Sequence, residues 1–319
     1  MSEVLPGAGS APAPPGPAGL AGVLRAARPR LVDAVFAAGW GVLPHVPRGV
    51  ADHAFNAVAT TSALRPGSYQ QLRANLRQVV GGQYTEQRLD ELVRQAVRSY
   101  TRYWREVFQL PSMDQSYVER HTEYLGSEHV ERAMRDGRGV VVALTHSGNW
   151  DAAAIVLCKV RGYTMTTVAE RLKPESLYER FVAFRESLGM TVVPLTGGAE
   201  PAPLVLKRAL KEGQMITLLA DRDLQANGIE VTLFGRRTTM PSGPALMALQ
   251  TGAALVPLEL GFTSHGWRIE FHPEVRIPAD GRLRERVTHG IHELAEVFTG
   301  IIGRNPQDWH MLQKFWPDV

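Results

Sequence analysis

The sequence contains little cysteine and little lysine. Cys158 is the one cysteine among 319 residues, which excludes an internal disulfide and a cysteine-based metal cluster and fits a reducing compartment. Five of the 35 basic residues are lysines and the rest are arginines, while the net charge is only +3. Arginine binds phosphate through a planar fork, so this bias suits a surface that faces phosphate or anionic lipid. A GC-rich genome would produce the same bias.

Long hydrophobic runs are missing, and so are basic runs with interleaved aromatic residues. The second absence disfavours binding to nucleic acid. The most apolar early stretch, residues 31–43, is interrupted by Asp33 and two glycines and is too short to cross a bilayer. Because Arg25, Arg28 and Arg30 precede it, this stretch either lies in a membrane interface or packs as a helix on its own domain.

What remains is an ordinary globular composition, with 44% hydrophobic and 21% charged residues. Residues 1–20 are rich in Gly, Ala and Pro and lack a basic start, which predicts a disordered tail rather than a signal peptide. No repeat or linker follows, so residues 21–319 are expected to form a single domain. Its helical N-terminal layer is expected to span residues 21–130, and its α/β core residues 131–319.

Short apolar strands and amphipathic helices alternate along the core. Strands are expected at residues 140–144, 165–168, 191–193, 215–219, 231–234, 254–260 and 267–271. Helices are expected at residues 69–80, 86–108, 151–160, 175–188, 202–212, 244–251 and 284–303. This alternation predicts an α/β fold whose central sheet is mostly parallel or mixed and is covered by helices on both faces.

The sharpest local feature is the stretch THSGNWD at residues 145–151, directly after an expected strand. Ligands of open α/β sheets bind beyond the carboxyl ends of the strands, so His146 lies where chemistry is expected. Asp151, five positions on, is predicted to bond to one ring nitrogen and leave the other free as a general base. The alternative is a histidine that caps a turn and is satisfied by its neighbours.

Charged residues also follow two other expected strands. They are Glu170 and Arg171 after one strand, and Asp221, Arg222 and Asp223 after the other. A turn-rich segment at 234–244, with Arg236 and Arg237, then leads into a helix of small residues. Taken singly, each cluster is best explained as solvated loop charge. Because carboxyl ends of parallel strands meet at one edge, together they favour a shared site.

Several stretches combine into a more specific pattern. They are HSGNWD at 146–151, VAERLKPESL at 168–177, RESLG at 185–189, DRDL at 221–224, MPSGP at 240–244, TGAAL at 251–255 and DWHML at 308–312. Together they resemble the lysophospholipid and lipid A late acyltransferases, and most closely the actinobacterial phosphatidylinositol mannoside acyltransferases. The resemblance runs from about residue 30 to the C-terminus.

The resemblance implies transfer of a long, palmitoyl-like acyl group from acyl-CoA to a mannose hydroxyl of a phosphatidylinositol mannoside. It implies a hydrophobic groove for the acyl chain, acyl-CoA as co-substrate without a further cofactor, and a peripheral place at the cytoplasmic face of the plasma membrane. By family position His146 is the base and Asp151 its motif partner. The relatives carry a Glu as second acid where this chain has Asp221, so Asp223 is an alternative.

Other site residues follow from the same resemblance. Contacts to acyl-CoA or lipid are expected from Arg185, Asn227, Gln250, Asn305, Pro306, Gln307 and Asp308. Supporting roles are expected for Glu170, Arg171, Asp223 and His310. No metal site is expected, because no second histidine stands at helical spacing from His146.

The chemistry that fits these groups is direct attack of a sugar hydroxyl on a thioester carbonyl. A thiol has a pKa of about 8.5 and leaves readily, so an acyl-enzyme is unnecessary. No Gly-x-Ser-x-Gly elbow occurs, Cys158 is expected in the core, and Ser147 is expected to be a turn residue. Two alternatives stay open: an acyltransferase acting on a lysophospholipid or lipid A-like lipid, and a non-catalytic lipid-binding membrane module.

Overall fold

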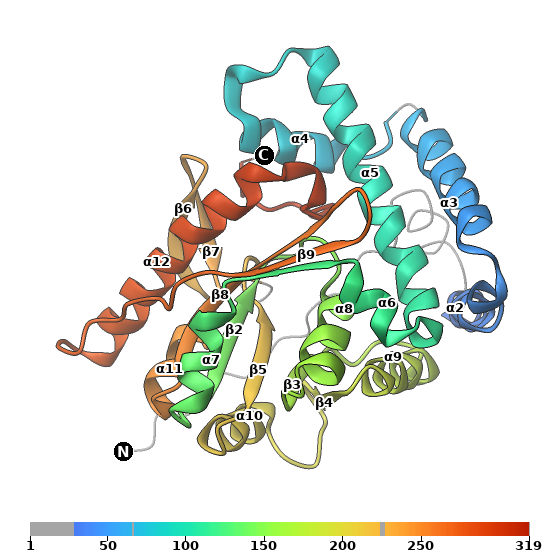
Figure 1. Cartoon of the computed structure of the whole chain (residues 1–319). Helices are drawn as coiled ribbons and strands as arrows, with labels where there is room; N and C mark the ends of the chain where they lie inside the picture. Colours follow the sequence, from blue (N-terminus) through green and yellow to red (C-terminus); the bar gives the residue numbers. More distant parts are fainter. Residues whose placement is uncertain (1–28, 66, 224–226, 319) are drawn as a thin grey trace.

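The computed structural model describes residues 29–65, 67–223 and 227–318, so the tail expected at residues 1–20 lies outside the described part. Seven strands form one sheet in the order β1-β9-β8-β2-β5-β3-β4 (Figure 1). They are β1 (Thr122–Leu125), β2 (Val140–Leu144), β3 (Met165–Ala169), β4 (Met190–Pro194), β5 (Met215–Leu219), β8 (Ala254–Phe262) and β9 (Trp267–Phe271). Strands β8, β2, β5, β3 and β4 are mutually parallel, whereas β9 runs antiparallel to β8. The expected α/β fold with a mostly parallel sheet is confirmed.

Both faces of the sheet are buried, which explains the unbroken apolar run of β2. Val140, Val142 and Leu144 pack into one core, and Val141 and Ala143 pack into the other. The first core is covered by α2 (Pro29–Val42), α5 (Glu86–Gln109), α6 (Gln115–Arg120), α7 (Ser127–Arg135), α8 (Trp150–Ala154), the π-helical turn η4 (Ile155–Val160) and α9 (Glu175–Ser187). The second is covered by α10 (Ala202–Lys211), α11 (Gly243–Thr251) and α12 (Leu283–Arg304).

The N-terminal layer is organised around α5, which stands beside the sheet in Figure 1. Helix α3 (Arg48–Ala63) packs along α5, and its last turns join α4 (Gln70–Val80) and the first half of α5 in a third apolar cluster. Short 3-10 turns complete the layer at Leu43–His45, Gly81–Gln83 and Leu110–Ser112. The second half of α5 is buried on nearly every side, because α3 lies outside it and the sheet core lies inside.

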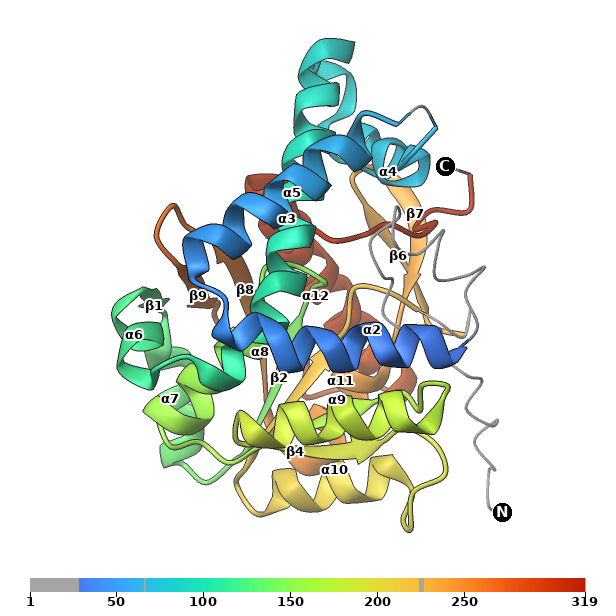
Figure 2. The ribbon, with the colours of Figure 1, turned by 90° about the vertical axis from the view of Figure 1, so that its right-hand side faces the viewer.

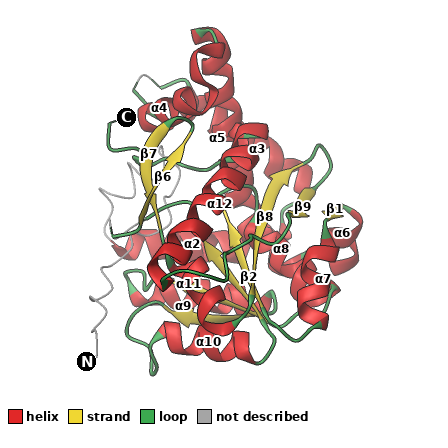
Figure 3. Cartoon of the chain, turned by 90° about the vertical axis from the view of Figure 1, so that its left-hand side faces the viewer, coloured by secondary structure: helices red, strands yellow, loops and turns green. Residues whose placement is uncertain are grey.

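Each strand and helix expected from the sequence is present, with ends within two residues, but two segments differ from the expectation. The turn-rich segment at 234–244 contains strand β7 (Arg236–Met240), which forms an antiparallel hairpin with β6 (Ile229–Leu233) beside α12 (Figure 3). The layer expected to be wholly helical contains β1, which extends the sheet beyond β9. Both strands are short and polar because solvent reaches one side of each, so neither shows an apolar run.

Residues 31–43 were expected either to lie in a membrane interface or to pack as a helix on the domain, and the structure of α2 bears on this choice. Phe36 is buried against Trp104, Phe108 and Phe181, and the indole of Trp40 donates to the carbonyl of Val107 at 3.1 Å. Figure 2 shows α2 lying across α9, with α3 on its other side. Packing on the domain is therefore confirmed for one face of α2, and contact with lipid stays a prediction.

The opposite face of these N-terminal helices carries exposed apolar side chains. They are Leu31, Val35 and Val42 on α2 and Val50 and Val58 on α3. Among the residues described, no helix combines the length and apolar character that a membrane span requires.

Candidate active site

The carboxyl ends of β2 and β5 bring His146 and Asp221 together. Both residues lie just beyond these neighbouring parallel strands, and His146 Nδ1 is 2.6 Å from Asp221 Oδ1. The second carboxylate oxygen accepts the backbone N–H of His146 at 3.0 Å and the indole N–H of Trp309 at 2.9 Å. Burial acts to raise the pKa of Asp221, but His146 and the other donors outweigh it and hold the pKa below its usual value. The group is thus a carboxylate at neutral pH.

This geometry assigns the imidazole tautomer. Since the Asp221 carboxylate accepts at Nδ1, that nitrogen carries the proton and Nε2 presents its lone pair. Asp221 is fully buried, while the His146 side chain is 25% exposed, so the ring can reach a bound substrate. Nε2 makes no hydrogen bond within the described residues. The arrangement is suited to a general base.

Asp151, the partner expected from the five-residue spacing, is not bonded to His146. Its Oδ1 accepts from Arg185 Nε at 3.1 Å and its Oδ2 accepts from the Tyr103 hydroxyl at 3.0 Å. Burial disfavours the Arg185 charge, but Asp151 and Tyr103 more than offset this and raise the pKa of the guanidinium. Trp150 and Asp151 begin α8, which carries the carboxylate toward α5 and α9. The expected His146–Asp151 pairing is therefore wrong.

The loop between β2 and α8 is held at each residue. His146 O accepts from His310 N at 2.7 Å, Ser147 forms a β-bridge with Trp309, and Gly148 N donates to Asp308 O at 3.0 Å. Gly148 has φ +58, and a Cβ there would lie 2.8 Å from the backbone nitrogen of Gly261. Only glycine meets both conditions.

The C-terminal turn contributes a buried polar group next to this loop. Asp308 Oδ1 accepts from Ser99 Oγ at 2.7 Å and Oδ2 accepts from Phe262 N at 2.9 Å, whereas burial raises the pKa of the carboxyl group. His310 Nε2 is 3.0 Å from Ser99 Oγ, and burial lowers the pKa of His310 to about 3. The His310 ring is therefore neutral at physiological pH. Pro306, which begins the 3-10 turn η5 (Pro306–Asp308), is buried, and Gln307 Nε2 lies 3.5 Å from Asn305 Oδ1.

The clusters after β3 and β5 meet at the same edge of the sheet. Burial raises the pKa of Glu170 to about 7, although Arg222 counteracts the shift. Arg171 instead pairs with Glu175 at 2.7 Å and donates to Gly197 O. Asp223 accepts the backbone N–H of Gly228 at 2.6 Å, which leaves Asp221 as the acid on His146. Asn227 is exposed in the same loop.

Two further sets of predicted contacts lie elsewhere. Gln250 is exposed at the end of α11, four residues before the first residue of β8, and β8 begins opposite Val140 at the amino end of β2. The structure therefore places Gln250 at the edge of the sheet opposite His146. Arg236 and Arg237 are exposed on β7, where Arg237 lies 3.5 Å from Glu230.

Neither candidate nucleophile is arranged for covalent catalysis. Cys158 is half-buried against the apolar core, and burial raises the pKa of its thiol to about 11. Ser147 is buried and accepts from Thr145 Oγ1 at 2.8 Å. The predictions of a core cysteine and a turn serine are confirmed.

Known proteins similar to this chain show which family it belongs to. Residues 25–317 match the family described as bacterial lipid A biosynthesis acyltransferase. A phosphatidylinositol mannoside acyltransferase of Mycolicibacterium smegmatis is 44% identical over 90% of this chain and 92% of its own length. Its counterpart in Mycobacterium tuberculosis is 42% identical over 89% and 88%, respectively. A lipid A biosynthesis acyltransferase of Haemophilus influenzae is 21% identical over 62% of this chain.

The chain belongs to this acyltransferase family. This confirms the family resemblance inferred from the short sequence stretches. The protein is therefore an acyltransferase. The candidate site also includes residues for which the sequence predicted no role: Tyr103 and Glu106 on α5, and Trp309, which lies within the stretch DWHML. One signal was available, because Arg105 and Glu106 interrupt the apolar stretch of α5 between Trp104 and Val107.

Proposed function

We propose that this acyltransferase moves a long fatty acyl group from acyl-CoA to a mannose hydroxyl of a phosphatidylinositol mannoside. The observation that carries the proposal is the His146–Asp221 pair, held at 2.6 Å with Nε2 facing outward at the carboxyl edge of the sheet. The acceptor is taken from the two mycobacterial relatives, which carry that name and align along nearly their whole length.

The proposed step balances with the groups present. The hydroxyl oxygen of the acceptor attacks the thioester carbonyl carbon, its proton passes to His146 Nε2, and the C–S bond breaks as the new ester forms. Coenzyme A leaves as a thiolate and takes the proton back from the imidazolium. Asp221 stabilises that imidazolium through Nδ1–H. A base placed in this way contributes about 10²–10⁴-fold to the rate.

The proposal includes a peripheral place at the cytoplasmic face of the plasma membrane, since both lipid substrates partition into a bilayer. Exposed Leu31 and Val42 on α2 give the protein an apolar surface for this purpose. Arg236 and Arg237 are the cations proposed to meet the phosphate of the lipid headgroup. The predicted acyl groove and the contacts of Asn227, Asn305 and Gln307 with acyl-CoA are part of the same proposal.

The test is release of coenzyme A from palmitoyl-CoA by the purified full-length protein, with a mannosylated phosphoinositide, a lysophospholipid or no acceptor. Release should require the mannosylated lipid and should fall about 10²–10⁴-fold in His146→Ala. His265→Ala is the matched control, because His265 is an exposed histidine in the turn between β8 and β9.

Each alternative gives its own result in this assay. If coenzyme A is released with the lysophospholipid but not with the mannosylated lipid, the acceptor is a lysophospholipid and the proposed acyl-transfer step is unchanged. Binding of lipid without turnover identifies a lipid-binding module. Equal turnover by wild type and His146→Ala contradicts the proposed base.

A further inference from the structure

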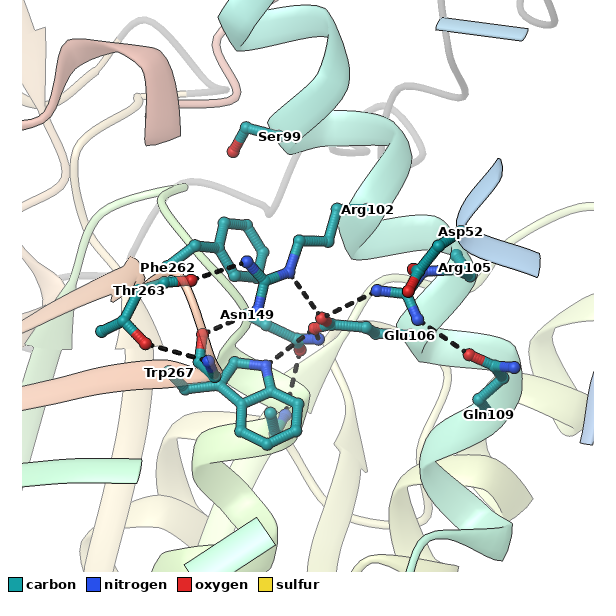
Figure 4. Close-up of polar contacts among 12 residues, drawn as sticks. Asp52, Ser99, Arg102, Arg105, Glu106, Gln109, Asn149, Phe262, Thr263 and Trp267 are labelled. Carbon is teal, nitrogen blue, oxygen red and sulfur yellow. Dashed lines mark hydrogen bonds and ion pairs between the residues drawn. The ribbon is translucent and has the colours of Figure 1, made fainter. Parts of the chain in front are cut away.

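Glu106 lies at the centre of a buried polar cluster between α5, the loop after β2 and β9 (Figure 4). Its Oε2 accepts from Asn149 Nδ2 and from Trp267 Nε1, both at 2.7 Å. Its Oε1 accepts from Arg102 Nε at 2.8 Å and lies 3.4 Å from an Arg105 nitrogen. All of these partners are N–H donors, so Glu106 acts as an acceptor only, as an ionised carboxylate does.

This cluster determines which way the Asn149 amide points. Asn149 Oδ1 accepts the backbone N–H of Ala152 at 2.9 Å and so caps α8, while Nδ2 faces Glu106. The reverse orientation would place an oxygen against the carboxylate and an NH2 group against an N–H donor. Glu106 therefore selects the rotamer in which Asn149 can cap the helix.

Asn149 lies three residues after His146, in the same short loop. Residues 146–148 of that loop are held by the C-terminal turn and Asp221, and Asn149 is held by α5. The cluster also fixes the β8–β9 turn, since Arg102 donates to Thr263 O at 3.0 Å and to Gly266 O at 2.7 Å. Glu106 is thus one of the contacts between the N-terminal layer and the candidate active site, and it is the one that reaches Asn149.

We propose that Glu106 is a positioning residue for His146: through Asn149 it holds the loop after β2 in the conformation that aligns the imidazole with Asp221 and a bound acyl donor. The proposal rests on the proposed function, because it concerns the same base. Burying the Glu106 carboxylate is costly, and this cost offsets its attraction to Arg102 and Arg105, so the ion pairs alone are weak evidence for a stabilising role.

The test exchanges the charge of the two partners. Asn149→Asp keeps a good helix cap but places a second carboxylate 2.7 Å from Glu106 Oε2, and Glu106→Gln removes the acceptor charge. The exchange is made in a Trp267→Phe background, because Trp267 Nε1 donates to the same Glu106 oxygen and would otherwise face the NH2 group of the glutamine. In the double variant the amide of the new glutamine then donates to the new aspartate, so the contact is restored with its direction reversed. Asp52→Asn is the control, because Asp52 pairs with Arg105 at 2.9 Å at the exposed end of the cluster.

Each single variant should lower kcat by about 10- to 100-fold with KM nearly unchanged, because a misaligned group affects the reaction more than binding. The double variant should recover to within a few-fold of Trp267→Phe alone, and Asp52→Asn should equal wild type. A double variant as impaired as the product of both singles overturns the proposal.

A second readout does not depend on turnover. The proton on His146 Nδ1 gives a downfield nuclear magnetic resonance because of its short bond to Asp221. The signal is assigned to His146 by its loss in His146→Ala. It should broaden or shift in Asn149→Asp and return to its original position in the double variant. If His146→Ala remains active while the signal behaves in this way, the proposed function fails but the positioning role stands. An unchanged signal in Asn149→Asp refutes the positioning role.

Discussion

At the scale of single residues, two buried carboxylates near His146 have different tasks. Asp221 bonds to the imidazole, whereas both oxygens of Asp151 are occupied by Arg185 and Tyr103. Sequence spacing favours Asp151 because it is near in the chain. Asp221 is 75 residues away and arrives only through the pairing of β2 with β5.

Asp151→Asn should therefore act mainly on stability. The substitution leaves the Arg185 charge buried without its counter-ion, which costs about 3–5 kcal/mol in the free energy of unfolding. Urea unfolding of Asp151→Asn, Arg185→Gln and the double variant measures this effect. The double variant should lose less than the two singles combined, and strict additivity would show that the pair is not coupled.

At the scale of elements, the loop after β2 lies against the backbone of β8. Gly148→Ala should cost the roughly 1 kcal/mol of a positive φ plus the repulsion of a Cβ only 2.8 Å from Gly261 N. Gly252→Ala is the matched control, since Gly252 also has a positive φ, +77, but has open space around its Cα. Thermal unfolding and turnover should both suffer more in Gly148→Ala. If both variants lose the same melting temperature and turnover, the close contact between residue 148 and Gly261 N does not contribute to the cost of Gly148→Ala.

Strand β8 is also joined to α12 by an ion cluster in which the buried Glu259 bonds to the half-exposed Arg304 and to His272 Nε2. Burial acts to raise the pKa of Glu259, but these partners outweigh it and lower the pKa to about 2. The ionised form is thus favoured by folding. Its contribution is full above the unfolded-state pKa of about 4.3 and is lost as the pH falls toward 2.

Glu259→Gln should accordingly destabilise the protein by about 1.5–3 kcal/mol at pH 7, the range for hydrogen bonds to charged groups. The difference from wild type should shrink as the pH falls from 4.3 toward 2. Chemical denaturation at pH 7, 4 and 3 tests both statements. A difference that stays constant over this range would assign the effect to packing rather than charge.

At the scale of the whole molecule, the sheet was predictable and the layer over it was less so. Strands such as Val140–Leu144 are buried on both faces and read as apolar runs, which is typical of a parallel sheet covered by helices. Strands β1 and β7 were missed because only one side of each is covered. The acid on His146 and the Glu106 cluster depend on contacts between distant segments, which local spacing does not encode.

The outer face of the N-terminal layer is the proposed lipid-facing surface. Deleting this layer would remove Phe36 and Trp40 from the core, so surface substitutions test the proposal better. Leu31→Ser/Val42→Ser should reduce binding to anionic phospholipid vesicles without altering the melting temperature, because these side chains are 53% and 58% exposed. Leu204→Ser on α10, at a residue 56% exposed, is the control. If wild type, Leu31→Ser/Val42→Ser and Leu204→Ser sediment equally with the vesicles, this surface does not bind lipid.

The central claim is that His146 and Asp221 act as one unit. It is tested most directly by kcat for coenzyme A release in Asp221→Asn, His146→Ala and the double variant. Asp221→Asn should lose about 10²–10⁴-fold, since an asparagine donates to Nδ1 and moves the proton to Nε2, where a base is needed. The double variant should be no slower than His146→Ala. Near wild-type turnover in Asp221→Asn, or losses that multiply in the double variant, would contradict the account.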